Sequence, residues 1–163
     1  MMRAVFWMLL ACSLAGCSDS PTSPSTTSAG FPDIRGTWIG SRTVDARLED
    51  GATTNNTCAE RWTIQTQSDV SFAGAFETGR APCLPQAGAL EGTITATGAI
   101  ATLSINMTLG EGGPCSVMTQ SALTGGFVGR TANIRFSDEI VCASGSGTFR
   151  STKRTVATAL TRQ

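Results

Sequence analysis

Short runs in which apolar and polar residues alternate fill the chain from Pro32 onward. In residues 59–67, for example, Trp62 and Ile64 fall on one face, and the residues beside them are polar. Alternation with a period of two predicts half-buried β-strands. The same pattern predicts strands over residues 35–44, 59–67, 70–77, 90–97, 99–107, 116–123, 127–136, 147–154 and 155–160.

Glycine-rich segments separate these runs, which is typical of antiparallel strands joined by short turns. We expect residues 124–126 to form one such turn. The sheet has eight strands if the C-terminal tail is continuous and nine if it divides. Because closure removes exposed sheet edges, we expect an all-β fold: an antiparallel eight-stranded up-and-down barrel. Its outer face is rich in Thr, Ser, Gln and Glu, which favours a barrel in water over one in a membrane.

The first residues resemble the signal peptide of bacterial lipoproteins. Arg3 precedes a short apolar run, and Leu14-Ala15-Gly16-Cys17 follows it. The run resembles a lipobox, which implies cleavage before Cys17 and lipidation of that residue. The alternative is an ordinary secretory leader in which Cys17 is incidental. The expected organisation is a signal peptide over residues 1–16, a lipidated tether over 17–32 and a barrel domain over 33–163.

Residues 18–30 of the expected tether are polar and contain two prolines, so their composition predicts an unstructured segment. In the lipoprotein family, Asp directly after the lipidated Cys usually retains the protein at the inner membrane. This chain has Ser18 there. The resemblance therefore implies export and a lipid anchor in the cell envelope, at the outer rather than the inner membrane.

Composition narrows the classes of function. Among the 163 residues, Lys and Arg together number 12, as do Asp and Glu, so a basic surface for nucleic acid is not expected. The sequence contains no His, which removes His-based catalytic triads and His-ligated metals. The pair Asp138-Glu139 falls in a predicted turn. We expect no enzyme activity, no cofactor and no metal.

The cysteines fit an exported protein. Of six in all, one lies in the leader and Cys17 is the expected lipidation site. Four remain in the barrel domain: Cys58, Cys83, Cys115 and Cys142. They allow three pairings. Because each pair flanks a predicted hairpin, we expect the disulfides Cys58–Cys83 and Cys115–Cys142.

The segment Gly36-Thr37-Trp38, followed by short glycine-punctuated strands, resembles the start of lipocalin-like and avidin-like barrels, the calycin group. The resemblance implies that Trp38 closes the barrel floor and that a late arginine, Arg150 or Arg154, packs over its ring. The polar residues with which avidins hold biotin have no counterparts here. In architecture, the chain is also similar to bacterial secreted inhibitors of metalloproteinases.

The expected ligand-binding residues face the barrel interior: Trp38, Trp62, Phe72 and Arg130. Alternation over residues 127–136 places Arg130 on the inward face. There it either faces an anionic group of a ligand or lies at the mouth of the barrel, where its guanidinium reaches water. The favoured hypothesis is a membrane-anchored lipoprotein whose non-catalytic barrel binds a small apolar or anionic ligand or an envelope protein. The alternatives are a structural or accessory protein with a filled barrel, or a protease-inhibitor-like barrel.

Overall fold

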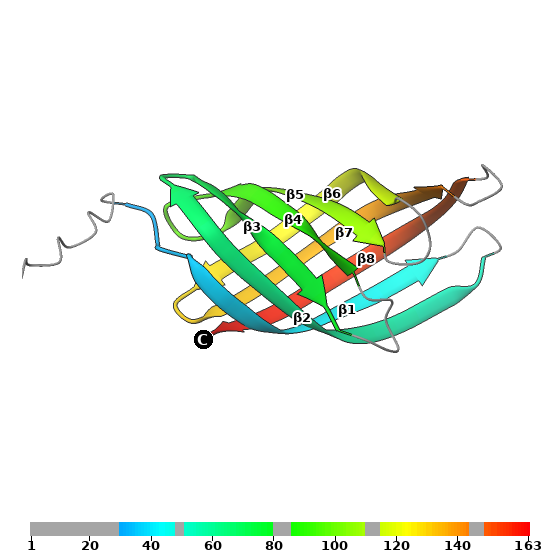
Figure 1. The fold of residues 1–163 in the computed structure, drawn as a ribbon, viewed down its shortest axis with the longest axis horizontal. Coiled ribbons are helices and arrows are strands. Elements are labelled where there is room, and N and C mark those ends of the chain that lie inside the picture. Colours follow the sequence, from blue (N-terminus) through cyan, green and yellow to red (C-terminus); the bar gives the residue numbers. More distant parts are fainter. Residues whose placement is uncertain (1–29, 48–50, 80–85, 110–114, 144–148) are drawn as a thin grey trace, which may run out of the picture.

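The computed structural model describes residues 30–47, 51–79, 86–109, 115–143 and 149–163. These residues form eight strands, shown in Figure 1. The strands are β1 (Gly36–Arg47), β2 (Thr53–Ser68), β3 (Ser71–Thr78), β4 (Gln86–Ile94), β5 (Ile100–Leu109), β6 (Cys115–Val128), β7 (Thr131–Ala143) and β8 (Phe149–Arg162). In this described part, no helix is long and apolar enough to cross a membrane.

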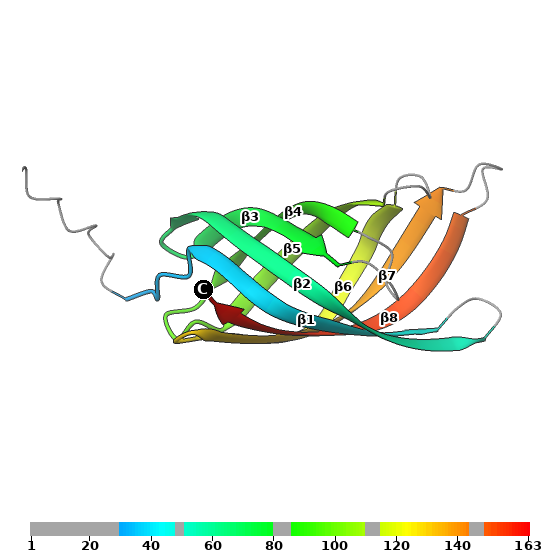
Figure 2. The same cartoon turned by 60° about the horizontal axis from the view of Figure 1, so that its bottom comes forward.

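All eight strands belong to one antiparallel sheet in the order β5-β4-β3-β2-β1-β8-β7-β6. Neighbours in sequence are neighbours in space, and β1 pairs with β8, so the sheet curls into a barrel (Figure 2). The seam between β5 and β6 is held by a bridge between Ala99 and Gly126 and a hydrogen bond of 2.9 Å from the Phe127 amide to the Gly98 carbonyl. The predicted all-β, up-and-down fold is confirmed as a nearly closed eight-stranded barrel.

One predicted turn is misplaced, and the structure decides between the two alternatives for the C-terminal tail. Residues 124–126 do not turn the chain but lie inside β6, and the chain turns at Gly129 and Arg130. The register of β6 against β7 shifts between Ser121 and Thr124, and Gly125 follows with φ of 92°. The bulge itself lies at Ala122 and Leu123, just before these glycines. The glycines allow neighbouring backbone to approach closely, because a side chain at Gly125 would collide with the Asn133 carbonyl oxygen. The C-terminal tail is one strand, β8, because β1 and β7 pair with it on either side.

An aromatic layer fills one part of the barrel interior. Its members are Trp38, Trp62, Phe72 and Phe127, each 3% exposed or less. The Phe127 ring centroid lies 5.0 Å from that of Trp38, 6.0 Å from Phe72 and 6.4 Å from Trp62, all in edge-to-face geometry. Phe127 thus occupies the centre of a dense apolar packing at the point where the seam closes.

Candidate functional site

Farther along the barrel, buried polar side chains lie among the apolar ones, which include Phe136. On β1 the inward positions change from Trp38 to Arg42, four residues or about 13 Å along the strand. The buried polar residues of this polar layer are Arg42, Glu60, Thr78, Asp138, Arg154 and Thr158. Buried charges are costly unless they are paired, so this layer is the first candidate for a functional site.

Glu60 is held at the boundary between the two layers. Its carboxylate accepts a hydrogen bond of 2.8 Å from the Trp62 indole N–H and one of 3.0 Å from the Thr158 hydroxyl. Burial raises the pKa of Glu60 above its ordinary value of 4.5, although the charge of Arg42 and these hydrogen bonds act in the opposite direction. The protonated form of this carboxyl is therefore favoured more than in water.

Arg42 is only 3% exposed, and its guanidinium is incompletely paired. One terminal nitrogen donates a hydrogen bond of 2.7 Å to the Gln86 side-chain oxygen. Its Nε is buried and has no hydrogen-bond partner among the residues that the structure describes. Burial lowers the pKa of Arg42, while Glu60 raises it. A buried arginine N–H that lacks an acceptor in the protein can donate a hydrogen bond to an acceptor atom of a bound ligand.

Asp138 and Arg154 form a buried ion pair across β7 and β8. Arg154 donates two hydrogen bonds to the Asp138 carboxylate, of 2.7 and 2.5 Å. The side chains are 1% and 8% exposed, respectively. The expected turn at Asp138-Glu139 is therefore wrong: both residues lie inside β7, where the register sets Asp138 opposite Arg154.

The predicted ligand-binding aromatics Trp38, Trp62 and Phe72 lie in the aromatic layer, where all three rings pack on Phe127. The Trp38 indole N–H donates to the Ile34 carbonyl at 2.9 Å. Sequence reasoning missed Phe127, although it opened a predicted strand. The misplaced turn had put Val128 on the inward face, whereas Val128 is 73% exposed.

Arg130 does not face a ligand site in the barrel interior; of the two predicted placements, the one at the mouth, reaching water, agrees with the structure. Arg130 lies in the exposed turn between β6 and β7, and its guanidinium donates to the Arg162 carbonyl at 2.8 Å. The turn interrupts the alternation on which the prediction depended. The arginine over Trp38 is Arg162, 5.8 Å from the ring centroid, and not Arg154, which pairs with Asp138. The other candidate, Arg150, has a side chain outside the described part of the chain.

The cysteine pairings stay predictions. Cys58 is buried on β2, and Cys83 lies outside the described residues. The β6–β7 register sets Cys115 directly opposite Cys142. Directly opposed residues of antiparallel strands have Cα atoms about 4.5–5.5 Å apart, within the range of disulfides. Cys17 and the expected leader also lie outside the described residues.

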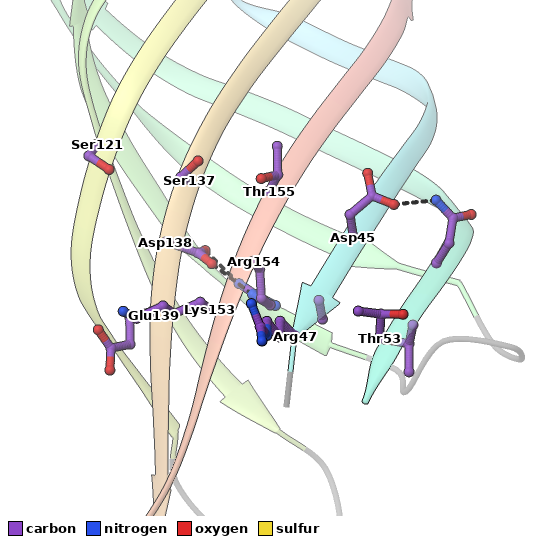
Figure 3. A pocket seen from close by; sticks show the side chains of 13 residues that line it. Asp45, Arg47, Thr53, Ser121, Ser137, Asp138, Glu139, Lys153, Arg154 and Thr155 are labelled. Atoms are coloured by element: carbon purple, nitrogen blue, oxygen red, sulfur yellow. Dashed lines mark hydrogen bonds and ion pairs between the residues drawn. The ribbon is translucent and has the colours of Figure 1, made fainter. Parts of the chain in front are cut away.

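A second concavity lies on the outside of the barrel and is shown in Figure 3. We call it the outer groove; its volume is about 830 Å³. Most of its lining comes from exposed or half-buried, outward-facing residues of β1, β2, β7 and β8. They include Asp45, Arg47, Thr53, Asn55, Ser137, Glu139, Lys153 and Thr155. The groove is thus mostly polar, and it adjoins the polar layer, because the buried residues Ala46, Asp138 and Arg154 also belong to its lining.

No protein-family model matches the chain, and no curated protein matches it. Two solved structures are similar in fold. One is a redesigned beta barrel, at 18% identity and a TM-score of 0.41, covering 80% of this chain and 91% of the other. The second is EF1p2_mFAP2b bound to DFHBI, at 17% identity and a TM-score of 0.43, covering 80% of this chain and 94% of the other. At these values the similarity concerns the small β-barrel fold alone.

Proposed function

We propose that the protein is a lipid-anchored protein of the cell envelope whose barrel is a non-catalytic binding module for a small anionic ligand. The observation that carries the ligand class is Arg42, a buried guanidinium whose Nε has no acceptor among the described residues. A carboxylate or phosphate oxygen supplies the acceptor and the negative charge that this position lacks.

The charges of the polar layer support an anion over an apolar molecule. Asp138 and Arg154 neutralise each other. Glu60 balances Arg42 incompletely, because burial favours its neutral form and no ion pair within 4.0 Å joins the two among the described residues. An uncompensated buried charge destabilises a fold by several kcal/mol. A small anion beside Arg42 relieves that cost.

The alternative of a filled structural or accessory barrel is favoured by one observation. In the aromatic layer, Phe127 packs edge to face on three other rings, so these rings contact each other and not a ligand. In this alternative, side chains and water fill the polar layer, no ligand binds there, and the barrel has a structural role. The two candidates differ in whether anions bind at Arg42.

The ligand class is tested by calorimetric titration of the full-length Cys17→Ser protein with acetate, succinate and inorganic phosphate. We expect binding of at least one anion, a loss of about tenfold or more in Arg42→Gln, and partial retention in Arg42→Lys, since one charge-assisted hydrogen bond contributes about 1.5–3 kcal/mol. Arg61→Gln is the matched control, because Arg61 is an exposed arginine on the outer face. Binding that is unchanged in a folded Arg42→Gln protein, or absent for all three anions, contradicts the proposed ligand class.

The anchor rests on the run Leu14-Ala15-Gly16-Cys17 and is tested separately. Mass spectrometry of the mature N-terminus should find Cys17 as the first residue, with acyl chains attached. Cys17→Ser should release the protein from membranes, because acyl chains contribute about 0.8 kcal/mol per buried CH₂. An unmodified Cys17, or cleavage at another residue, contradicts the anchor without affecting the ligand test.

A further inference from the structure

The outer groove carries two parallel rows of side chains that cross the strands. The register aligns the first row from β2 to β6 as Asn55, Asp45, Thr155, Ser137 and Ser121. At about 4.8 Å between strands, this row spans roughly 19 Å. Apart from Asp45, its members are uncharged side chains with hydroxyl or amide groups, and the Asp45 carboxylate accepts a hydrogen bond from the Asn55 amide. The row therefore offers a ladder of polar groups to a ligand lying across the strands.

The second row contains two neighbouring cations. Arg47 and Lys153 are Cα partners in the β1–β8 ladder, and both are exposed in the groove. Neither has an ion pair or a side-chain hydrogen bond among the residues that the structure describes. Like charges directly opposite each other destabilise a sheet. The acidic Glu139 faces Lys153 from the other side and has interactions of its own.

We infer that the outer groove binds an anionic polysaccharide segment, a class of ligand distinct from the small anion of the polar layer. The sugar hydroxyls lie along the row from Asn55 to Ser121, and a carboxylate or phosphate group of the sugar lies between Arg47 and Lys153. That group removes the repulsion between the two cations. An extended, repeating and hydroxyl-rich chain fits a groove built from one polar side chain per strand.

The place of the groove favours a glycan over the lipid headgroups of the protein's own membrane. β1 begins at Gly36, directly after residues 30–35, and runs away from them along the barrel (Figure 1). Arg47, the last residue of β1, lines the groove. The 12 residues of β1 correspond to about 40 Å of strand. Under the proposed anchoring at Cys17, the groove lies at the end of the barrel remote from the anchored terminus.

The test uses the full-length Cys17→Ser protein and an oligomer of galacturonic acid, with a neutral maltose oligomer of equal length as the comparison. We expect the acidic oligomer to bind, with an affinity that falls as salt rises. Arg47→Gln and Lys153→Gln should each weaken binding about tenfold, and the double variant further. Arg135→Gln, which removes an exposed arginine from the outer face of β7 outside the groove, should bind as the parent does.

Three outcomes overturn the inference. The first is equal binding of the neutral oligomer, and the second is binding that survives in the folded double variant. The third is Arg47- and Lys153-dependent binding to vesicles containing phosphatidylglycerol, together with no binding to the acidic oligomer. Arg42→Gln separates this site from the interior one, because it should leave binding of the acidic oligomer unchanged.

Discussion

The aromatic layer and the polar layer occupy the same barrel but are stabilised in different ways. In the aromatic layer, four rings are almost fully buried, and the seam between β5 and β6 is bridged beside Phe127. In the polar layer, an ion pair, a hydrogen-bonded carboxyl and an incompletely paired arginine lie beside apolar side chains such as Phe136. Apolar burial stabilises a fold without requiring a partner, whereas buried charges need one. We therefore expect the aromatic layer to maintain the fold and the polar layer to be available for binding.

Removing a ring from the aromatic layer should have the largest effect. Trp38 is fully buried and contacts Phe127 and Arg162, so Trp38→Ala should lower the free energy of unfolding by about 3–5 kcal/mol. Ile39→Ala is the control on the neighbouring outward position, which is 39% exposed. Thermal and urea unfolding measure both. A change in melting temperature below about 2 °C for Trp38→Ala would contradict its role in the core.

Breaking the ion pair of the polar layer should come next. Arg154→Met leaves Asp138 buried without its partner and should cost about 3–5 kcal/mol at neutral pH. The double variant Arg154→Met/Asp138→Leu should recover much of that loss, because both charges are gone. Arg61→Met breaks the exposed pair with Glu77, at 3.5 Å, and should cost less than about 1 kcal/mol. Equal effects of Arg154→Met and Arg61→Met on urea unfolding would show that the buried pair adds nothing.

The predicted disulfides should contribute about 3 kcal/mol each, because each closes a loop of about 25 residues in the chain-entropy model. Non-reducing peptide mapping should link Cys58 to Cys83 and Cys115 to Cys142. Because Cys115 and Cys142 lie on the Asp138 side of the β6–β7 hairpin, their reduction should speed amide exchange near the polar layer more than near Phe127. Four free thiols in exported protein, or a link between Cys58 and Cys142, would refute the pairing.

The smallest expected effect is a pH dependence due to Glu60. Its pKa is raised in the folded state, so its contribution to stability is complete below the ordinary value of 4.5 and is lost as the pH rises through the folded-state pKa. Glu60→Gln removes this titration and can keep an oxygen acceptor for Trp62. The variant should therefore gain stability relative to the parent as the pH increases from 4.5. Glu77→Gln, at an exposed carboxyl, is the control, and parallel stability curves for the parent and Glu60→Gln would contradict the raised pKa.

The alternation of apolar and polar residues was enough to predict an antiparallel eight-stranded barrel and the inward position of Trp38. Side-chain alternation is a local property of a strand, so it can be recognised from a few consecutive residues. The faces of Arg130 and Val128 were predicted wrongly, because one misplaced turn reverses the alternation of every residue up to the true turn. The need for glycine at position 125 depends on how closely β7 approaches, which the residues of β6 alone do not specify.

The amino-acid sequence by itself determined which runs form strands. It also showed that no histidine is present for catalysis or metal binding, and that the first residues resemble a lipoprotein leader. Only the tertiary structure decided which charges meet. Asp138 and Arg154 are 16 residues apart, Glu60 and Thr158 are 98 apart, and the arginine over Trp38 proved to be Arg162. The first contact follows from the pairing of β7 with β8, and the other two arise because β8 pairs with β1. The outer groove forms where strands from both ends of the chain lie side by side. Pairings between distant strands follow from the register of the closed sheet, which no single strand encodes.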